Sequence, residues 1–182
     1  MTRRSVGIVG RMRAGKDTLA RVLVRDHGYT RLAFADPLKA VAHATSPLVR
    51  SGEYLGDVVD RIGWERAKDA YPEARRFLQR LGVAARDMLG PNVWIKALTD
   101  RARLVHGGPV VVPDVRFLNE AHELRGRGFV ILRIRRPGLT DPDPHVSETE
   151  SDAIRADVTL INDSTPDVLS DRVRDLVERY LL

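Results

Sequence analysis

The chain has 182 residues, 43% of them hydrophobic and 30% charged, so it can form one domain with a substantial core and an inserted subdomain. It has no cysteine, which excludes disulfides and thiolate metal sites and fits a reducing cytoplasm. The net charge is +5, but the basic residues are scattered among acids, and aromatic residues make up only 5% of the chain. Because aromatic side chains supply the stacking surfaces for bases, this composition favours a small phosphorylated ligand over a stable nucleic-acid complex.

The N-terminal residues do not read as a targeting signal. Residues 1–5 are basic, but only a short apolar run follows before the first glycines, which indicates a strand and not a signal peptide. Every apolar stretch is too short to span a bilayer. We therefore expect a cytoplasmic protein without a membrane partner.

A glycine-bounded loop follows this first predicted strand, Val6–Val9. Residues 10–16 read Gly-Arg-Met-Arg-Ala-Gly-Lys, which keeps the P-loop spacing G-x-x-x-x-G-K, and the run after it has helical periodicity. The glycines let backbone N–H groups point at a phosphate, and the helix N-terminus adds a positive dipole end. A plain glycine turn before a helix is the alternative. The order of strand, loop and helix favours a nucleoside triphosphate site in which Lys16 neutralises the outer phosphates.

The motif does not decide which group of this loop contacts magnesium. Asp17 occupies the place after the lysine that Ser or Thr usually holds, and the hydroxyl comes one residue later, at Thr18. Asp17, Thr18 or water could therefore contact the ion.

A second acid follows a short buried strand, Pro109–Pro113. An acid at the carboxyl end of a strand beside a P-loop strand typically holds magnesium through water, and Asp114 has that place. The alternative is that Asp114 only caps the next predicted helix, 117–125. The P-loop upstream favours the magnesium role. Arg116 could pair with Asp114 or hold a phosphate.

A helical pattern without a convincing strand extends from residue 40 to about 105, which is longer than a simple crossover between strands requires. We interpret it as an inserted lobe. It begins with a helix that Asp36 is expected to cap, with Pro37 at its first position and Lys39 near a phosphorylated substrate; capping alone is the alternative. Breaks are predicted at residues 46–47, 51–52, 63, 71–72 and 90–91.

Within this lobe, Gln79 and Arg86 lie seven residues apart, two turns along one helix face. Such a face could read a base edge and hold a phosphate, although most exposed arginines only solvate a helix. The predicted apolar stripe of this helix extends to Met88 and Leu89. The lobe also carries both tryptophans: we expect Trp94 in the core and leave the role of Trp64 open.

Three further strands are predicted. One lies near the start of the chain, at 29–34, and two lie in its last third, at 129–134 and 157–161. A proline-rich segment, 137–145, follows Arg133, Arg135 and Arg136 and suits a flap that closes over phosphates. His145 and Glu148 are candidates there, and Ser147 with Glu150 fits a capping box.

A final predicted helix follows the last strand. Thr165 is expected to cap it, with a stripe that ends at Val177 and Tyr180. Asn162 and Asp163, in the turn before it, either line an adenine pocket or form a plain turn.

With these segments in place, the chain resembles the phage-type deoxynucleoside monophosphate kinases of the P-loop NMP kinase superfamily over nearly its whole length. The matching segments are Gly15–Thr18, Phe34–Lys39, Gly63–Glu65, Leu78–Gly82 with Arg86, Asn92–Trp94, Asp114–Phe117 with Asn119 and Glu120, and His145–Glu148. The resemblance implies a three-layer α/β/α fold with a five-stranded parallel sheet. It implies a core of 1–35, 106–136 and 154–182, a helical NMP-binding insertion, 36–105, and a lid, 137–153.

The resemblance also implies an activity: transfer of the γ-phosphoryl of ATP to a deoxynucleoside monophosphate, with Mg²⁺. ATP would be bound by Gly10, Arg13, Ala14, Gly15, Lys16, Asp17, Thr18, Asn162 and Asp163. The acceptor would be bound by Asp36, Lys39, Trp64, Arg75, Gln79, Arg86, Arg116, His145 and Glu148. Catalysis would fall to Lys16, Asp114, Arg135 and Arg136, and metal binding to Asp17, Thr18 and Asp114. Related kinases are often dimers, and a phage source would place the protein in the host cytoplasm.

Three other functions would use parts of the same pattern. A dephospho-coenzyme A kinase-like or phosphomevalonate kinase-like enzyme would share the loop, the lid and the Asn162-Asp163 ending, but the lobe with Gln79, Arg86 and Trp94 argues against it. An ATP-dependent nucleic-acid-binding protein would be expected to carry a basic run, which this chain lacks. A nucleotide-binding regulator without catalysis is disfavoured by Asp114 and the lid arginines.

Overall fold

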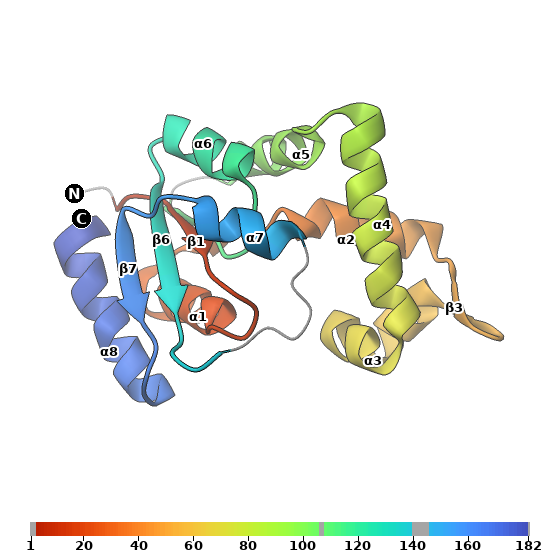
Figure 1. The fold of residues 1–182 in the computed structure, drawn as a ribbon, viewed down its shortest axis with the longest axis horizontal. Coiled ribbons are helices and arrows are strands. Elements are labelled where there is room, and N and C mark those ends of the chain that lie inside the picture. The colour runs from red at the N-terminus through yellow and green to blue at the C-terminus, as the bar shows by residue number, and fades with distance from the viewer. Residues whose placement is uncertain (1–2, 106–107, 140–145, 182) are drawn as a thin grey trace. The chain divides into compact units, whose positions relative to one another are not determined.

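Five parallel strands form one sheet in the order β2-β5-β1-β6-β7. Figure 1 labels β1, β6 and β7 of this sheet. The computed structural model describes residues 3–105, 108–139 and 146–181, and for 146–149 only the backbone. β1 is central, with Val6 paired to Val111 on one side and to Val130 on the other. The strands are β1 Val6–Val9, β2 Thr30–Arg31, β5 Val110–Val112, β6 Val130–Arg135 and β7 Val158–Ile161.

All five strands were predicted, and the three-layer α/β/α class is confirmed. The continuous apolar runs of β1 and β5 are fully buried, as strands covered on both faces require. The second strand is much shorter than the predicted 29–34. It is an edge strand that pairs with β5, and although Leu32 N donates to Val111 O at 3.0 Å, a helix begins at Ala35.

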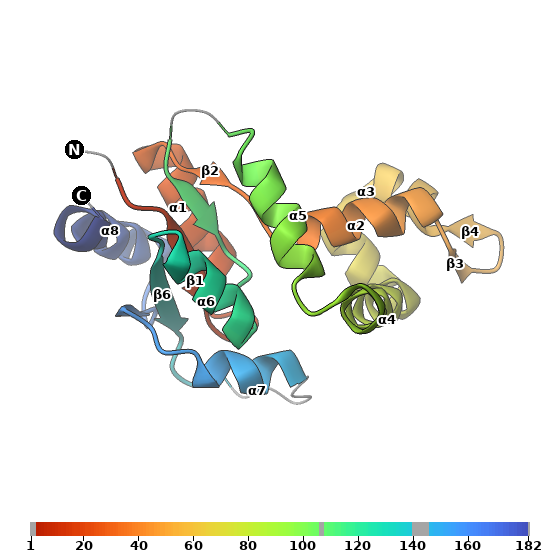
Figure 2. The ribbon, with the colours of Figure 1, turned by 90° about the horizontal axis from the view of Figure 1, so that it is seen from above.

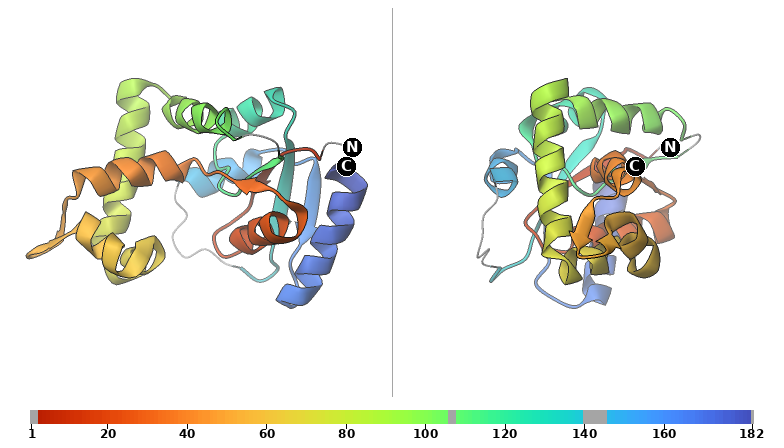
Figure 3. Two further views of the ribbon diagram at one scale, coloured as in Figure 1. Left: turned by 180° about the vertical axis from the view of Figure 1, so that it is seen from behind. Right: turned by 90° about the vertical axis from the view of Figure 1, so that its right-hand side faces the viewer.

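Helices cover both faces of this sheet (Figure 2). α1 Lys16–His27 and α8 Pro166–Leu176 pack together on one face, and α6 Leu118–Gly126 and α7 Val146–Ala153 pack together on the other. Leu19 and Leu23 of α1 and Val173 of α8 are buried in the core between helix and sheet. The two ends of the described chain lie side by side, because Arg4 N donates to Leu181 O at 2.8 Å (Figure 3).

The last helix confirms one prediction and corrects another. Thr165 caps α8, its side chain accepting from Val168 N at 3.4 Å. Tyr180, however, is 51% exposed, so its place in the apolar stripe is wrong. The chain continues after α8 as a π-helix, Val177–Leu181, whose wider turn places Leu181 in the core instead.

The chain forms two compact units, Met1–Ala33 with Thr99–Leu182, and Phe34–Leu98. The first contains the sheet. The second contains three helices that pack pairwise around Leu55, Val58 and Ala74, and α5 Val93–Ala102 spans the boundary. The helices of this unit are α2 Ala35–Thr45, α3 Leu55–Ala70 and α4 Pro72–Leu89.

The helical unit corrects three sequence predictions. A two-stranded antiparallel hairpin, β3 Leu48–Arg50 and β4 Glu53–Tyr54, lies where no strand was predicted, because strands this short carry no alternating pattern. Asp36 is not the cap of α2, which begins at Ala35 after Phe34. Met88 and Leu89 are 82% and 74% exposed, so the apolar stripe of α4 ends before them.

Other predictions for this unit are confirmed. Gly63 interrupts α3 with φ 78° and ψ 161°, a conformation that favours glycine. Trp94 is buried, and its indole Nε1 donates to Gly82 O at 3.2 Å. Within the residues that the structure describes, no helix is long and apolar enough to cross a membrane.

Gly7 in β1 provides a test of how closely the sheet and α6 pack. A Cβ atom there would lie 2.8 Å from Leu124 Cδ1 and 2.9 Å from Ile131 Cδ1, and both side chains are buried. We expect Gly7→Ala to lower the free energy of unfolding by about 1–3 kcal/mol through overpacking. Urea unfolding measures this. Gly126→Ala, where a Cβ meets open space, is the matched control; equal stability of both variants would contradict the packing argument.

Candidate active site

The loop between β1 and α1 has the backbone geometry of a phosphate-binding turn. Arg13 and Gly15 have positive φ angles of 62° and 107°, so the chain reverses its direction sharply before α1 begins at Lys16. A Cβ atom on Gly10 would lie 2.5 Å from Ile134 O, so only glycine fits where the loop leaves the sheet. The loop therefore delivers the helix N-terminus, with the N–H groups of its first turn, to the carboxyl end of the sheet.

Lys16 lies across this loop. Its Nζ donates to Gly10 O at 2.6 Å and to Arg11 O at 2.8 Å. These two bonds hold the ammonium group of Lys16 against the backbone at the start of the loop.

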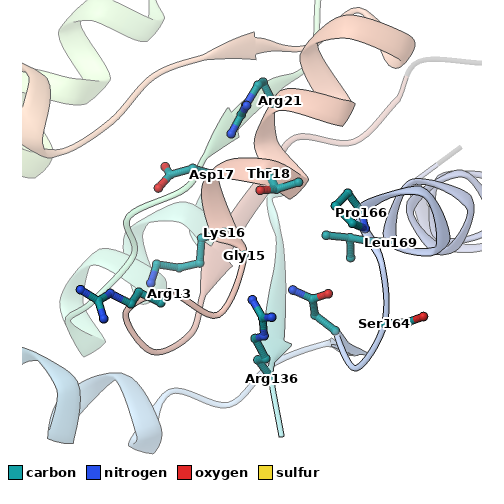
Figure 4. Close-up of a pocket in the computed structure, with 11 residues that line it drawn as sticks. Arg13, Gly15, Lys16, Asp17, Thr18, Arg21, Arg136, Ser164, Pro166 and Leu169 are labelled. Carbon is teal, nitrogen blue, oxygen red and sulfur yellow. The ribbon is translucent and has the colours of Figure 1, made fainter. Parts of the chain in front are cut away.

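A cavity of about 360 Å³ opens beside the loop, and Figure 4 shows the side chains around it. Among the residues that the structure describes, four cations line it, Lys16, Arg13, Arg21 and Arg136, against one acid, Asp17. Such an excess of positive charge suits a polyphosphate. The remaining lining residues are Gly15, Thr18, Asn162, Ser164, Pro166 and Leu169.

Several of these lining residues were not predicted from the sequence. Arg21 lies one turn after Asp17 in α1, a spacing that could have placed it on the same helix face. Ser164, Pro166 and Leu169 belong to the turn and helix after β7, where only Asn162 and Asp163 were expected to contact a ligand.

A second cavity of about 380 Å³ adjoins the first, sharing Arg136, Asn162 and Ser164 with it. Asp163 also lines it, but the Asp163 carboxylate accepts from Arg172 Nη1 at 2.7 Å. Asn162 is buried, and its side-chain amide donates to Ala14 O at 2.9 Å. The turn of Asn162 and Asp163 thus lies against the P-loop, whatever its role toward a base.

Asp114 follows β5, the strand beside β1, and is half-buried. The alternative that it caps α6 is wrong. α6 begins at Leu118, and the buried carboxylate of Glu120 accepts from Arg116 N at 2.9 Å and from Phe117 N at 3.1 Å. The Arg116 side chain is exposed.

The metal predictions concern Asp17, Thr18 and Asp114. No three acids or histidines gather as a metal cage among the residues that are described. Magnesium in phosphoryl-transfer sites takes only one or two carboxylates and completes its shell with phosphates and water. Asp17 and Thr18 line the cavity and Asp114 follows the neighbouring strand β5, and one or two such carboxylates are the number that this smaller demand needs.

The three arginines at the end of β6 have three different environments. Arg133 is buried and donates to the carbonyls of Ser151, at 3.0 Å, and Ile154, so it binds the end of α7 to the sheet. Burial lowers the pKa of the Arg133 guanidinium, and the charge of Arg135 lowers it further. Arg135 is exposed, and Arg136 lines both cavities.

Asp152 of α7 lies between Arg133 and the P-loop. Its two carboxylate oxygens lie 3.7 Å from Arg133 Nη1 and 2.8 Å from Arg11 Nη2. Nothing in the local sequence predicts this pairing, because the three residues come from distant segments.

The lid candidates are only partly within the described residues. His145 and the side chain of Glu148 lie outside them. α7 begins at Val146, so Ser147 is inside the helix and not at its cap, which corrects the predicted capping box.

The helical unit carries its own set of candidates. Lys39 Nζ lies 3.7 Å from Glu65 Oε1 and 5.9 Å from the centroid of the Trp64 ring. Burial would raise the pKa of Glu65, but its bond to Lys68 and the charges of Lys68 and Lys39 outweigh burial and lower it. The structure therefore brings Lys39 and half-buried Trp64 together.

The α4 candidates differ in exposure. Gln79 is exposed, and Arg86 is half-buried with Nη1 donating to Gly82 O at 3.3 Å. Arg75 Nη2 lies 3.4 Å from Asp69 Oδ1. Asp36 lies in the first turn of α2 and is half-buried.

The chain is similar in sequence and in fold to known proteins. No protein-family model matches the chain. A protein of Acanthamoeba polyphaga mimivirus named "Putative deoxynucleotide monophosphate kinase" is 31% identical over 173 residues, which cover 88% of this chain and 89% of that protein. Among solved structures, TT1252 from Thermus thermophilus has a TM-score of 0.52 at 18% identity over 99% of both chains. Shikimate kinase from Aquifex aeolicus has a TM-score of 0.52 at 12% identity over 96% of both chains.

The parallel sheet, the glycine loop with its lysine and the structural likeness to shikimate kinase define a P-loop kinase fold, which confirms the expected fold class. Proteins of this class transfer phosphoryl groups. The extent and identity of the match to the mimiviral protein go further: the chain belongs to the deoxynucleotide monophosphate kinase family.

Arg133 gives a test of the brace between β6 and α7. Arg133→Met removes the guanidinium that donates to the buried carbonyls of Ser151 and Ile154, so we expect the free energy of unfolding to fall by about 2–4 kcal/mol. Urea unfolding measures the loss. Arg135→Met, on the same strand but exposed, is expected to stay within about 0.5 kcal/mol of the parent. A loss at Arg135 as large as at Arg133 would show that the brace is not what stabilises this end of the sheet.

Proposed function

We propose that the protein transfers the γ-phosphoryl of ATP to a deoxynucleoside 5′-monophosphate, giving a deoxynucleoside diphosphate and ADP. The single observation that carries this proposal is the cation-lined cavity at the P-loop, in a chain of the deoxynucleotide monophosphate kinase family. A cavity walled by a helix N-terminus, Lys16 and three arginines suits the triphosphate of a donor nucleotide.

For the donor, residues 10–18 would surround the phosphates, with Lys16 carrying the charge that faces them. Asn162 and Asp163, at the two cavities beyond the loop, would lie toward the adenosine. Asp114, Asp17 and Thr18 would hold Mg²⁺, which when bound offsets the negative charge of the phosphates.

For the acceptor, the helical unit supplies the candidates. Lys39 is already oriented by Glu65 and Trp64, and Arg86 is oriented by its own helix, so both present a cation that needs little reordering to meet a phosphate. Gln79, exposed on the same helix as Arg86, offers an amide to a base edge. The further acceptor candidates are Asp36, Trp64, Arg75, Arg116, His145 and Glu148.

Phosphoryl transfer between the two nucleotides requires the protein to position them and to offset their charge, and it requires no covalent bond to the protein. A monophosphate is largely dianionic near neutral pH, so its oxygen can attack without a dedicated general base. Lys16 and Arg136 at the cavity, with Arg135 beside them on β6, would offset the charge on the group in transfer. Excluding water from the site would fall to the lid segment, 137–153.

A substrate panel tests the proposal directly. Purified protein is incubated with ATP, Mg²⁺ and one candidate acceptor, and ADP is measured by a coupled assay. The acceptors are dTMP, dGMP, dCMP, dAMP, their ribose counterparts and dephospho-coenzyme A. We expect ADP formation only when a deoxynucleoside monophosphate is present. Equal rates with ribonucleotides would contradict the deoxyribose preference, and activity confined to dephospho-coenzyme A would replace the proposed acceptor altogether.

Lys16 tests the donor site within that assay. Lys16→Ala removes the cation at the mouth of the loop, so we expect kcat/KM for ATP to fall about 10²–10³-fold. The matched control is Lys96→Ala, an exposed lysine of α5, which is expected to keep parental activity. Similar unfolding curves for both variants would separate a catalytic loss from a loss of fold. Activity retained in Lys16→Ala would contradict the assignment of the cavity.

A further inference from the structure

We infer that Asn162 is a positioning residue that holds the P-loop in its phosphate-binding shape, and not a reader of the donor base. The inference deepens the proposed function, on which it rests for the identity of the loop's ligand. It starts from the hydrogen bond that Asn162 Nδ2 donates to Ala14 O at 2.9 Å.

The carbonyl of Ala14 needs a partner from outside the loop. Ala14 is 1% exposed and stands between Arg13 and Gly15, whose φ angles are 62° and 107°. Residues with positive φ break the hydrogen-bond ladder of helix or strand, and a loop that turns its N–H groups toward an anion turns carbonyls away from it. A buried carbonyl left without a donor costs about 1–3 kcal/mol. Asn162 removes that cost.

Asn162 is itself fixed by the sheet. Its backbone N donates to Arg135 O at 2.7 Å, directly after the pairing of Arg135 with Ile161 between β6 and β7. The residue is 8% exposed, so its side chain has little room to rotate. The side-chain amide therefore connects the end of β7 to the P-loop at Ala14.

Gly15 shows how close this contact is. A Cβ atom on Gly15 would lie 2.6 Å from Asn162 Nδ2, well inside contact distance. The second glycine of the loop is thus required twice, by its positive φ and by the approach of the Asn162 amide. A residue that served only the base would not need to lie against the backbone of the phosphate turn.

The two possible roles differ in what they do to ligands without a base. A base reader changes the ratio of affinities for ATP and GTP and leaves inorganic tripolyphosphate unaffected. A brace of the loop changes all three affinities by the same factor, because they share only the phosphates.

The experiment measures the affinities of ATP, GTP and tripolyphosphate by isothermal titration calorimetry. Asn162→Asp keeps the shape of the side chain but turns an acceptor toward the Ala14 carbonyl, and Asn162→Ala removes the donor. We expect Asn162→Ala to weaken all three ligands by about the same factor, roughly tenfold, and Asn162→Asp to weaken them more. Asn119→Asp is the charge-matched control, because its side-chain oxygen would still accept from Glu120 N. It is expected to bind like the parent.

Each outcome decides the inference. Unchanged affinities in Asn162→Ala, or a loss confined to ATP, would overturn it, the second in favour of base reading. Thermal unfolding of each variant, with and without tripolyphosphate, separates lost binding from lost fold. The calorimetry needs no acceptor, so a parent protein that binds triphosphates but does not phosphorylate deoxynucleotides would overturn the proposed function and leave the test of Asn162 intact. A parent that binds none of the three ligands would overturn both.

Discussion

The fold of the sheet unit depends on one constraint, that the backbone leaving β1 must reverse before α1 begins without leaving buried polar groups unpaired. β1 is the central strand, and its neighbours β5 and β6 fix it on both sides. The reversal therefore falls within the loop itself, where Arg13 and Gly15 have positive φ angles. Lys16 then binds the carbonyls at the base of the loop, and the remaining strands place their ends around it.

The arginines at the end of β6 differ in how deeply they are buried. Arg133 and Arg135 lie on the same face of β6 by the two-residue period of a strand, yet α7 covers only the first. The covered guanidinium becomes a donor to helix carbonyls, and the uncovered one faces solvent. Arg136, beyond the strand, reaches the cavities. The three arginines therefore have different environments: Arg133 is bonded to the carbonyls beside α7, Arg135 is exposed at the end of the strand, and Arg136 lines the cavities.

The sequence was informative where local patterns are strong. The loop from Gly10 to Lys16, the five strands and the cap at Thr165 follow from spacing and from side chains that act on their own backbone. The hairpin of β3 and β4 did not, since two or three residues give no period to read. Tyr180 was misplaced because the change from α- to π-helix depends on packing against the core.

The candidate site divides in the same way. Lys16 and Asp17 are identified by the motif alone, whereas Arg21 and the pairing of Asp152 with Arg11 depend on which elements the fold brings together. Contacts between residues that are distant in sequence do not affect the local sequence pattern around either residue. The roles of the acceptor candidates, Gln79 and Arg86 among them, stay predictions, because helix periodicity fixes a face but not its ligand.

The insertion of the helical unit also has a consequence for how the chain folds. Thr30 of β2 pairs with Val110 of β5, yet the whole of Phe34–Leu98 lies between them in the sequence. An unfolded segment of that length makes closing this pair of strands slow and entropically costly. A segment that has already collapsed around its own core brings the two strands near each other at a smaller loss of entropy. The helical unit can thus act as an internal folding aid, and the edge of the sheet is expected to form last.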